Sequence, residues 1–208
     1  MKLEFKNIKK VFGKKVALND ISFTAKSGRA FGLLGRNGAG KTTTIRILMN
    51  VFKANGGEVL LDGEPLDYKT VSFGYLPEER GLYPKEKIFN QLVYLATLKG
   101  MEKKAAEESV NYWLDFLNMT EYKTKQLDTL SKGNQQKIQL ISSIAHNPDI
   151  VVFDEPFTGL DPVNAKLLES VVKEQIKQNK IVIFSSHQMN YIEEFCDDIL
   201  IMKNGEIM

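Results

Sequence analysis

Apolar runs and amphipathic stretches alternate through the second half of the chain. Residues 150–153 and 181–184 are wholly apolar, which is typical of parallel strands buried on both faces. Between them, Asp161-Pro162 is a suitable helix start, with Asp as the N-cap and Pro at the first helical position. Apolar residues follow at helical spacing. Alternating buried strands and helices predict an α/β core with a mainly parallel sheet.

The first third of the chain predicts a smaller antiparallel part. We expect short strands at residues 3–8, 21–25, 30–34 and 58–61. Within this part, one amphipathic helix follows Gly35. Its apolar face consists of Ile45, Leu48, Met49 and Phe52.

A helical block separates the two halves. Residues 71–76 predict a strand that ends at Pro77, and residues 86–118 predict two helices divided at Gly100. We therefore expect one domain, residues 1–208, with a helical subdomain inserted at approximately residues 83–128. Further helices are expected at 134–146 and 187–196, and a hairpin at 198–208.

Composition narrows the possible classes of protein. A length of 208 residues suits one compact domain with a sizeable core. The net charge of +2 gives no support for a nucleic-acid partner, and Cys196 alone cannot form an internal disulfide. No apolar run approaches the roughly 18 residues of a membrane-spanning helix. The charged first residues are unlike a secretory signal, so we expect any membrane role to work through a partner.

Residues 35–42, GRNGAGKT, fit the phosphate-binding pattern G-x-x-x-x-G-K-[ST]. A predicted strand precedes the loop and an amphipathic helix follows it, which is the context this motif requires. Glycines allow successive N–H groups to face one point, and the helix start adds partial positive charge. Lys41 can then reach the β- and γ-phosphates, and Thr42 can coordinate Mg²⁺. Thr43 is a candidate for the α-phosphate region.

Two acids follow the apolar run at 150–153. Ligand sites in open α/β sheets lie at the carboxyl ends of strands, where Asp154 and Glu155 are expected. Asp154 can hold Mg²⁺ there, and Glu155 can orient or deprotonate a water that attacks the γ-phosphate.

Residues 130–137, LSKGNQQK, predict a second helix start that could face an anion. Ser131 can cap this helix, and a simple cap would explain it on physical grounds alone. A second anion-binding helix start is unexpected in a domain with one phosphate loop.

Together these segments resemble the ATP-binding subunit of ABC transporters, over essentially all 208 residues. GRNGAGKT resembles its Walker A, VVFDEP its Walker B with the catalytic Glu, and LSKGNQQK its signature motif. TGLDP at 158–162 resembles the D-loop, SSH at 185–187 the switch histidine, and GYLPE at 74–78 the Q-loop.

The resemblance implies a fold, an activity and a set of site residues. The fold is a P-loop NTPase core with an antiparallel β subdomain and an inserted helical subdomain, and the activity is ATP hydrolysis with ATP and Mg²⁺. The implied catalytic residues are Lys41, Glu155 and His187, and the implied metal residues are Thr42, Glu78 and Asp154. The implied nucleotide contacts are Phe12 for the adenine, Gly35, Arg36, Asn37, Gly38, Ala39, Gly40, Lys41, Thr42, Thr43, Ser131, Gly133 and Asp161.

The resemblance also implies partners and a location. Two such domains face each other head to tail, so that Ser131 and Gly133 of one chain contact the γ-phosphate held by the other. A transmembrane permease binds the helical subdomain, for which Tyr83, Phe89 and Tyr94 are candidates. These residues could instead pack the helices together, which is the favoured interpretation for Phe89. The style of the motifs is similar to ABC-2 type exporters, which implies a peripheral position at the cytoplasmic face of the membrane.

Three positions depart from the family pattern, namely Lys132, Asn134 and Glu78, the last in the place of the Q-loop Gln. His146 has no counterpart among the motifs, and we expect it to be a surface cation at a helix end. Relatives often continue past the final hairpin, so we expect the natural chain to be longer.

Two other functions are open to a chain with this phosphate loop. A soluble ABC-type regulator of translation or DNA repair would be expected to carry two nucleotide units in tandem. A P-loop kinase would leave the signature and D-loop segments unexplained.

Overall fold

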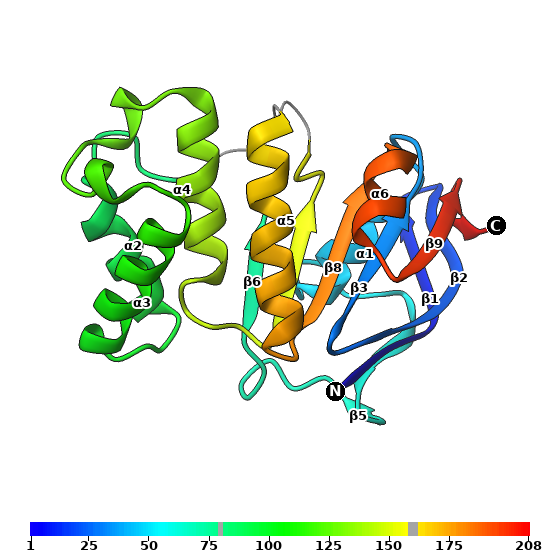
Figure 1. Ribbon diagram of the computed structural model, residues 1–208. Coiled ribbons are helices and arrows are strands. Elements are labelled where there is room, and N and C mark those ends of the chain that lie inside the picture. Colours follow the sequence, from blue (N-terminus) through cyan, green and yellow to red (C-terminus); the bar gives the residue numbers. More distant parts are fainter. Residues whose placement is uncertain (79–80, 158–161) are drawn as a thin grey trace.

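A computed structural model describes residues 1–78, 81–157 and 162–208, and Figure 1 shows their arrangement. The larger sheet has the order β10-β9-β3-β8-β7-β6. All its neighbouring strands pair in parallel except β10, which is antiparallel to β9. Its strands are β3 (Arg29–Leu34), β6 (Phe73–Leu76), β7 (Ile150–Asp154), β8 (Ile181–Ser186), β9 (Asp198–Lys203) and β10 (Glu206–Ile207).

The smaller sheet is antiparallel and has the order β2-β1-β4-β5. Its strands are β1 (Lys2–Phe12), β2 (Lys15–Lys26), β4 (Gly56–Leu61) and β5 (Glu64–Pro65). The predicted antiparallel part is therefore confirmed for three of its four strands, and β1 and β2 extend beyond the predicted ranges 3–8 and 21–25. The predicted strand at 30–34 is β3, which belongs to the larger sheet and pairs in parallel with β8 and β9.

Six α-helices and two short 3₁₀ turns complete the described part of the chain. They are α1 (Lys41–Leu48), α2 (Ile88–Leu98), α3 (Lys103–Phe116), η1 (Thr120–Tyr122), η2 (Leu127–Thr129), α4 (Lys132–Ile144), α5 (Pro162–Lys177) and α6 (Met189–Phe195). In Figure 1, α5 and α6 lie over one face of the larger sheet, and α2 and α3 lie beyond α4 at one side. Within the described residues, no helix combines the length and apolar character needed to cross a bilayer.

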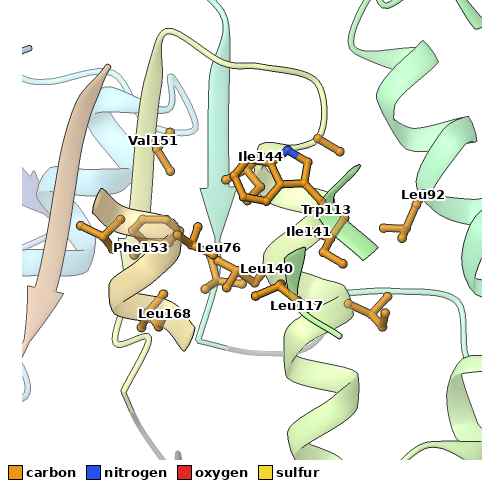
Figure 2. Packing of buried hydrophobic residues seen from close by; sticks show 14 of the residues in the cluster. Leu76, Leu92, Trp113, Leu117, Leu140, Ile141, Ile144, Val151, Phe153 and Leu168 are labelled. Atoms are coloured by element: carbon orange, nitrogen blue, oxygen red, sulfur yellow. The ribbon is translucent and has the colours of Figure 1, made fainter. Parts of the chain in front are cut away.

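The central strands β7 and β8 are buried on both faces because two apolar clusters enclose the larger sheet. Val151 and Phe153 pack with α4 and α5, as Figure 2 shows for Phe153 and Leu168. Their neighbours Ile150 and Val152 point to the opposite face, toward the small sheet and α1. This two-sided burial explains why these strands are wholly apolar in sequence.

The helical block packs through its own apolar residues. Trp113 of α3 is 4% exposed, and Figure 2 shows it beside Ile141 and Ile144 of α4. Leu92 of α2 is fully buried in the same cluster. These contacts join the block to α4, and α4 in turn contacts β6.

Two predictions about individual residues are wrong. The helix after Gly35 ends at Leu48, so Phe52 lies outside it, because Asn50 adopts a left-handed conformation with φ of 55° that ends the helical path. His146 is not a surface cation: it is 8% exposed and its Nε2 lies 2.9 Å from the carbonyl oxygen of Phe73. Burial lowers the pKa of His146, which keeps the ring neutral.

Candidate nucleotide site

The predicted phosphate loop joins the end of β3 to the start of α1. Gly40 caps α1 with a left-handed φ of 111°, and this N-cap residue has no side chain that could bond the first N–H groups of the helix. A Cβ at Gly40 would lie 2.7 Å from Leu18 Cδ2, so only glycine fits. The unpaired N–H groups and the helix dipole favour an anion at this point.

A cleft of about 580 Å³ opens over this loop. Its lining includes residues 37–43 together with Phe12, Glu78 and Glu155. Gly35 and Arg36 are not among the lining residues. Gly35 ties the loop to the end of β8, because its N–H donates to the Ser186 carbonyl at 3.1 Å. Arg36 is exposed.

Lys41 is buried at the first position of α1, where the helix dipole disfavours a cation. Its Nζ donates to the Gly35 carbonyl oxygen at 2.6 Å and lies 3.2 Å from Glu155 Oε1. Because both side chains are buried, each charge needs the other. The structure therefore brings together the two ends of the predicted site, which are 114 positions apart in the sequence.

Glu155 connects this ion pair to His187. Its second oxygen, Oε2, lies 2.9 Å from His187 Nδ1. A carboxylate can only accept, so Nδ1 carries the proton and donates it. The backbone of Glu155 is left-handed, with φ of 50°, and its N–H donates to both the carbonyl and the hydroxyl of Ser185 at 3.1 Å. Glu155 is thus linked to Lys41 by an ion pair and to His187 by a hydrogen bond, beside the loop.

Asp154 is held from two neighbouring strands. Its Oδ1 accepts from the Ser185 hydroxyl, and its Oδ2 accepts from the Tyr75 hydroxyl at 3.3 Å. Burial, followed by the charge of Asp154, raises the pKa of Tyr75 to about 12, so the phenol remains a donor at neutral pH.

Thr42, Glu78 and Asp154 share a second cavity of about 340 Å³ beside the loop. They supply one hydroxyl and two carboxylates, and oxygen ligands of this kind are what Mg²⁺ prefers. The chemistry of these three donors is therefore suited to a magnesium ion next to the phosphate loop, and Arg46 lines the same cavity.

Phe12 lies at the end of β1 with 42% of its surface exposed, and its ring lines the cleft. Phe52 packs edge-on against it, with the ring centroids 5.3 Å apart. The Lys10 ammonium lies 5.0 Å from the Phe12 centroid. The cleft therefore offers an aromatic surface suited to a base.

Ser131 and Gly133 lie at the start of α4 and do not line this cleft. Ser131 is exposed, and its hydroxyl accepts the Asn134 N–H at 3.4 Å, as the predicted cap requires. Gly133 is half-buried, and a Cβ there would lie 2.9 Å from Asn164 Nδ2. Asp161 lies outside the described residues.

Comparison with known proteins places this geometry in a family. The sequence model described as ABC transporter matches residues 18–158. The chain belongs to the ABC transporter family. As a member of this family, the chain binds nucleotide, hydrolyses ATP and serves as the ATP-binding subunit of a transporter. The resemblance drawn from the motifs is thereby confirmed, as is the fold class.

Individual relatives agree with this assignment. The uncharacterised ABC transporter ATP-binding protein YhaQ of Bacillus subtilis is 45% identical over 98% of this chain and 69% of its own length. The linearmycin resistance ATP-binding protein LnrL of the same species is 32% identical over 99% of this chain and 68% of its own length. A solved ATP-binding subunit of an ABC transporter superposes with a TM-score of 0.90 at 27% identity, covering all of this chain and 88% of that one.

Three residues around the site were not predicted to take part in it, although Ser185 lies in the SSH segment and Tyr75 in the GYLPE segment. Ser185 is the first polar residue after an apolar run, but a serine at a strand end is common in proteins. In the sequence, Tyr75 and Phe52 have the spacing of residues that pack in the apolar core. Their contacts depend on which strands are neighbours in the sheet, which is a property of the fold.

Proposed function

We propose that this ATPase drives an exporter, working as a head-to-tail pair of cassettes on a transmembrane permease. The observation that supports ATP hydrolysis by this site is the position of Glu155 beside the phosphate loop, where it contacts both Lys41 and His187. Export is supported by the similarity to LnrL, whose name links it to resistance against linearmycin.

We propose that ATP occupies the cleft with its adenine on Phe12 and its phosphates over residues 35–43. The N–H groups of the loop and the Lys41 ammonium bind the β- and γ-phosphate oxygens, with Thr43 near the α-phosphate. Thr42, Asp154 and Glu78 would hold Mg²⁺, which neutralises phosphate charge when it is bound.

Glu155 is the proposed general base. When the phosphate oxygens replace Glu155 as the ion-pair partner of Lys41, Glu155 Oε1 becomes available to accept a proton from water. The water oxygen bonds the γ-phosphorus as the bond to the ADP oxygen breaks, which yields ADP and phosphate. His187 holds Oε2 through Nδ1, so the carboxylate keeps its orientation while Oε1 takes the proton.

Ser131 and Gly133 are proposed to serve the nucleotide of a second cassette. Both lie at a capped helix start outside the cleft of their own chain, and such a start attracts an anion. A γ-phosphate shared between two chains would hold the pair together until hydrolysis removes it. Asp161 is proposed to contribute at the same interface.

We propose that the helical subdomain, approximately residues 83–128, binds the permease and thereby places the ATPase at the cytoplasmic face of the membrane. Tyr83 and Tyr94 are each 54% exposed. Phe89, Val93 and Tyr94 contribute to an open groove of about 330 Å³ on this part of the surface. Exposed aromatic residues beside a groove are typical of protein interfaces.

The substitution Glu155→Gln tests the proposed chemistry. Gln keeps the shape of the side chain but is a far weaker base, so we expect ATP binding to persist and phosphate release to fall by about 10²- to 10⁴-fold. Phosphate release without an added acceptor also distinguishes hydrolysis from a kinase reaction. Glu121→Gln, on an exposed turn, is the control. Normal phosphate release by Glu155→Gln would remove Glu155 from its catalytic role.

A further inference from the structure

Two hydroxyl groups outside the predicted site bind the Asp154 carboxylate. One belongs to Ser185 at the end of β8, and the other to Tyr75 on β6. Neither residue belongs to the set proposed to bind nucleotide or metal. Their placement raises the question of what they contribute to ATP hydrolysis.

The register of the sheet brings these groups to one face. Asp154 pairs directly with Ser185 in the parallel ladder between β7 and β8. Tyr75 pairs with Val152, two residues before Asp154 on β7. Side chains alternate along a strand, so Asp154 shares a face with Val152 and Tyr75. This face packs on α1, where the phosphate loop ends.

The two hydroxyls restrict the Asp154 carboxylate without using all of its acceptor capacity. A carboxylate has about four lone-pair sites, and one donor on each oxygen leaves sites free for a metal or its water. Ser185 is fully buried and cannot exchange this contact for solvent. Hydrogen bonds to a metal ligand of this kind fix its orientation.

Ser185 also bonds the backbone of Glu155, the residue that follows Asp154. Its hydroxyl and its carbonyl both accept the Glu155 N–H at 3.1 Å. These bonds help to keep Glu155 in the left-handed conformation that only a minority of non-glycine residues adopt. One serine therefore connects the side chain of Asp154 to the backbone of Glu155.

We infer that Ser185 is a positioning residue that, assisted by Tyr75, sets the orientation of the Asp154 carboxylate toward Mg²⁺ and of Glu155 toward water. The inference rests on the metal role proposed above for Asp154. It predicts that loss of the Ser185 hydroxyl weakens metal binding without weakening metal-free nucleotide binding.

Four variants test this inference against a matched control. Ser185→Ala removes the hydroxyl, Ser185→Thr retains it, and Tyr75→Phe removes the second donor. Asp154→Asn tests the metal role itself. The control is Ser143→Ala, because Ser143 is a buried serine in α4 whose hydroxyl donates to the Leu140 carbonyl of its own helix.

The measurements separate metal binding from folding and from activity. Mn²⁺ binding in the presence of ADP is followed by electron paramagnetic resonance, ADP affinity is measured in EDTA, and melting temperature reports folding. Phosphate release as a function of Mg²⁺ concentration adds a kinetic readout. We expect Ser185→Ala to weaken Mn²⁺ binding by about 10- to 100-fold. Tyr75→Phe should have a smaller effect in the same direction, and Ser185→Thr should restore binding.

The outcomes distinguish a failure of the positioning role of Ser185 from a failure of the metal role of Asp154. If Asp154→Asn weakens Mn²⁺ binding but Ser185→Ala and Tyr75→Phe match Ser143→Ala, the positioning role is wrong and the metal site stands. If Asp154→Asn also leaves Mn²⁺ binding unchanged, the proposed metal role fails and the inference falls with it. If Ser185→Ala does not fold, Tyr75→Phe decides, because it removes one hydroxyl from a half-buried side chain.

Discussion

At the scale of single residues, the site depends on charges that are buried in pairs. Lys41 and Glu155 are 5% and 8% exposed, so either charge alone would carry a large desolvation cost. Sequence motifs were sufficient to nominate both residues. Their contact could not be predicted, because it requires the end of β7 to lie beside the start of α1. The same limit applies to Ser185, whose role depends on its register with Asp154.

For His146, the prediction from the local sequence was wrong. A histidine at a helix end commonly interacts with the helix dipole as a cation. Here the end of α4 packs on β6, and the Phe73 carbonyl oxygen accepts a hydrogen bond from His146 Nε2–H instead. Only tertiary packing decides between these two environments.

The burial of His146 predicts a dependence of stability on pH. Because burial lowers its pKa below the usual 6.5, the unfolded state binds more protons than the folded state between about pH 6.5 and the lowered pKa of the folded state. The free energy of unfolding should therefore fall as the pH drops through this range. His146→Gln keeps a donor for the Phe73 carbonyl but does not titrate.

Urea unfolding of both proteins at pH 7.5, 6.5 and 5.5 measures this effect. Relative to His146→Gln, the natural chain should lose stability on acidification, by at most about 1.4 kcal/mol per pH unit for one proton. The comparison cancels the contribution of His187, which both proteins carry. Curves that stay parallel from pH 7.5 to 5.5 would show that His146 does not titrate differently on folding.

At the scale of elements, the clearest predictions were the strands buried on both faces. Wholly apolar runs at 150–153 and 181–184 correspond to β7 and β8, since apolar clusters lie on both sides. Helix ends were less certain, as α1 shows. Its apolar spacing continues to Phe52, but the left-handed Asn50 stops the helix earlier. Phe52 instead packs on Phe12 at the cleft.

The helical block predicts separable effects on stability and on coupling. Tyr83→Ala and Tyr94→Ala remove exposed rings, so the free energy of unfolding should change by no more than about 0.5 kcal/mol. Binding to the proposed transmembrane permease should nevertheless weaken, and ATPase stimulation by that permease should fall. Tyr112→Ala, a half-exposed tyrosine of α3 outside the groove, is the control. Tyr83 would be excluded from the interface if its variant coupled as well as Tyr112→Ala.

At the scale of the whole molecule, the site lies where the layers of the fold meet. The larger sheet places β3, β7 and β8 side by side, and their carboxyl ends carry the phosphate loop, the two acids and His187. In Figure 1 the helical block and α4 lie to one side of this arrangement. Ser131 and Gly133, at the start of α4, do not line the cleft of their own chain, and this supports the proposal that they serve a second cassette.

The most direct test of this account is the mass of the Glu155→Gln protein in solution with and without ATP. Sedimentation equilibrium in the presence of Mg²⁺ and ATP should give twice the 23.6 kDa of one chain, and removal of ATP should return the single-chain mass. Slow hydrolysis in this variant keeps the γ-phosphate in place throughout the measurement. A protein that binds ATP but keeps the mass of one chain at every concentration would contradict the proposed head-to-tail pair.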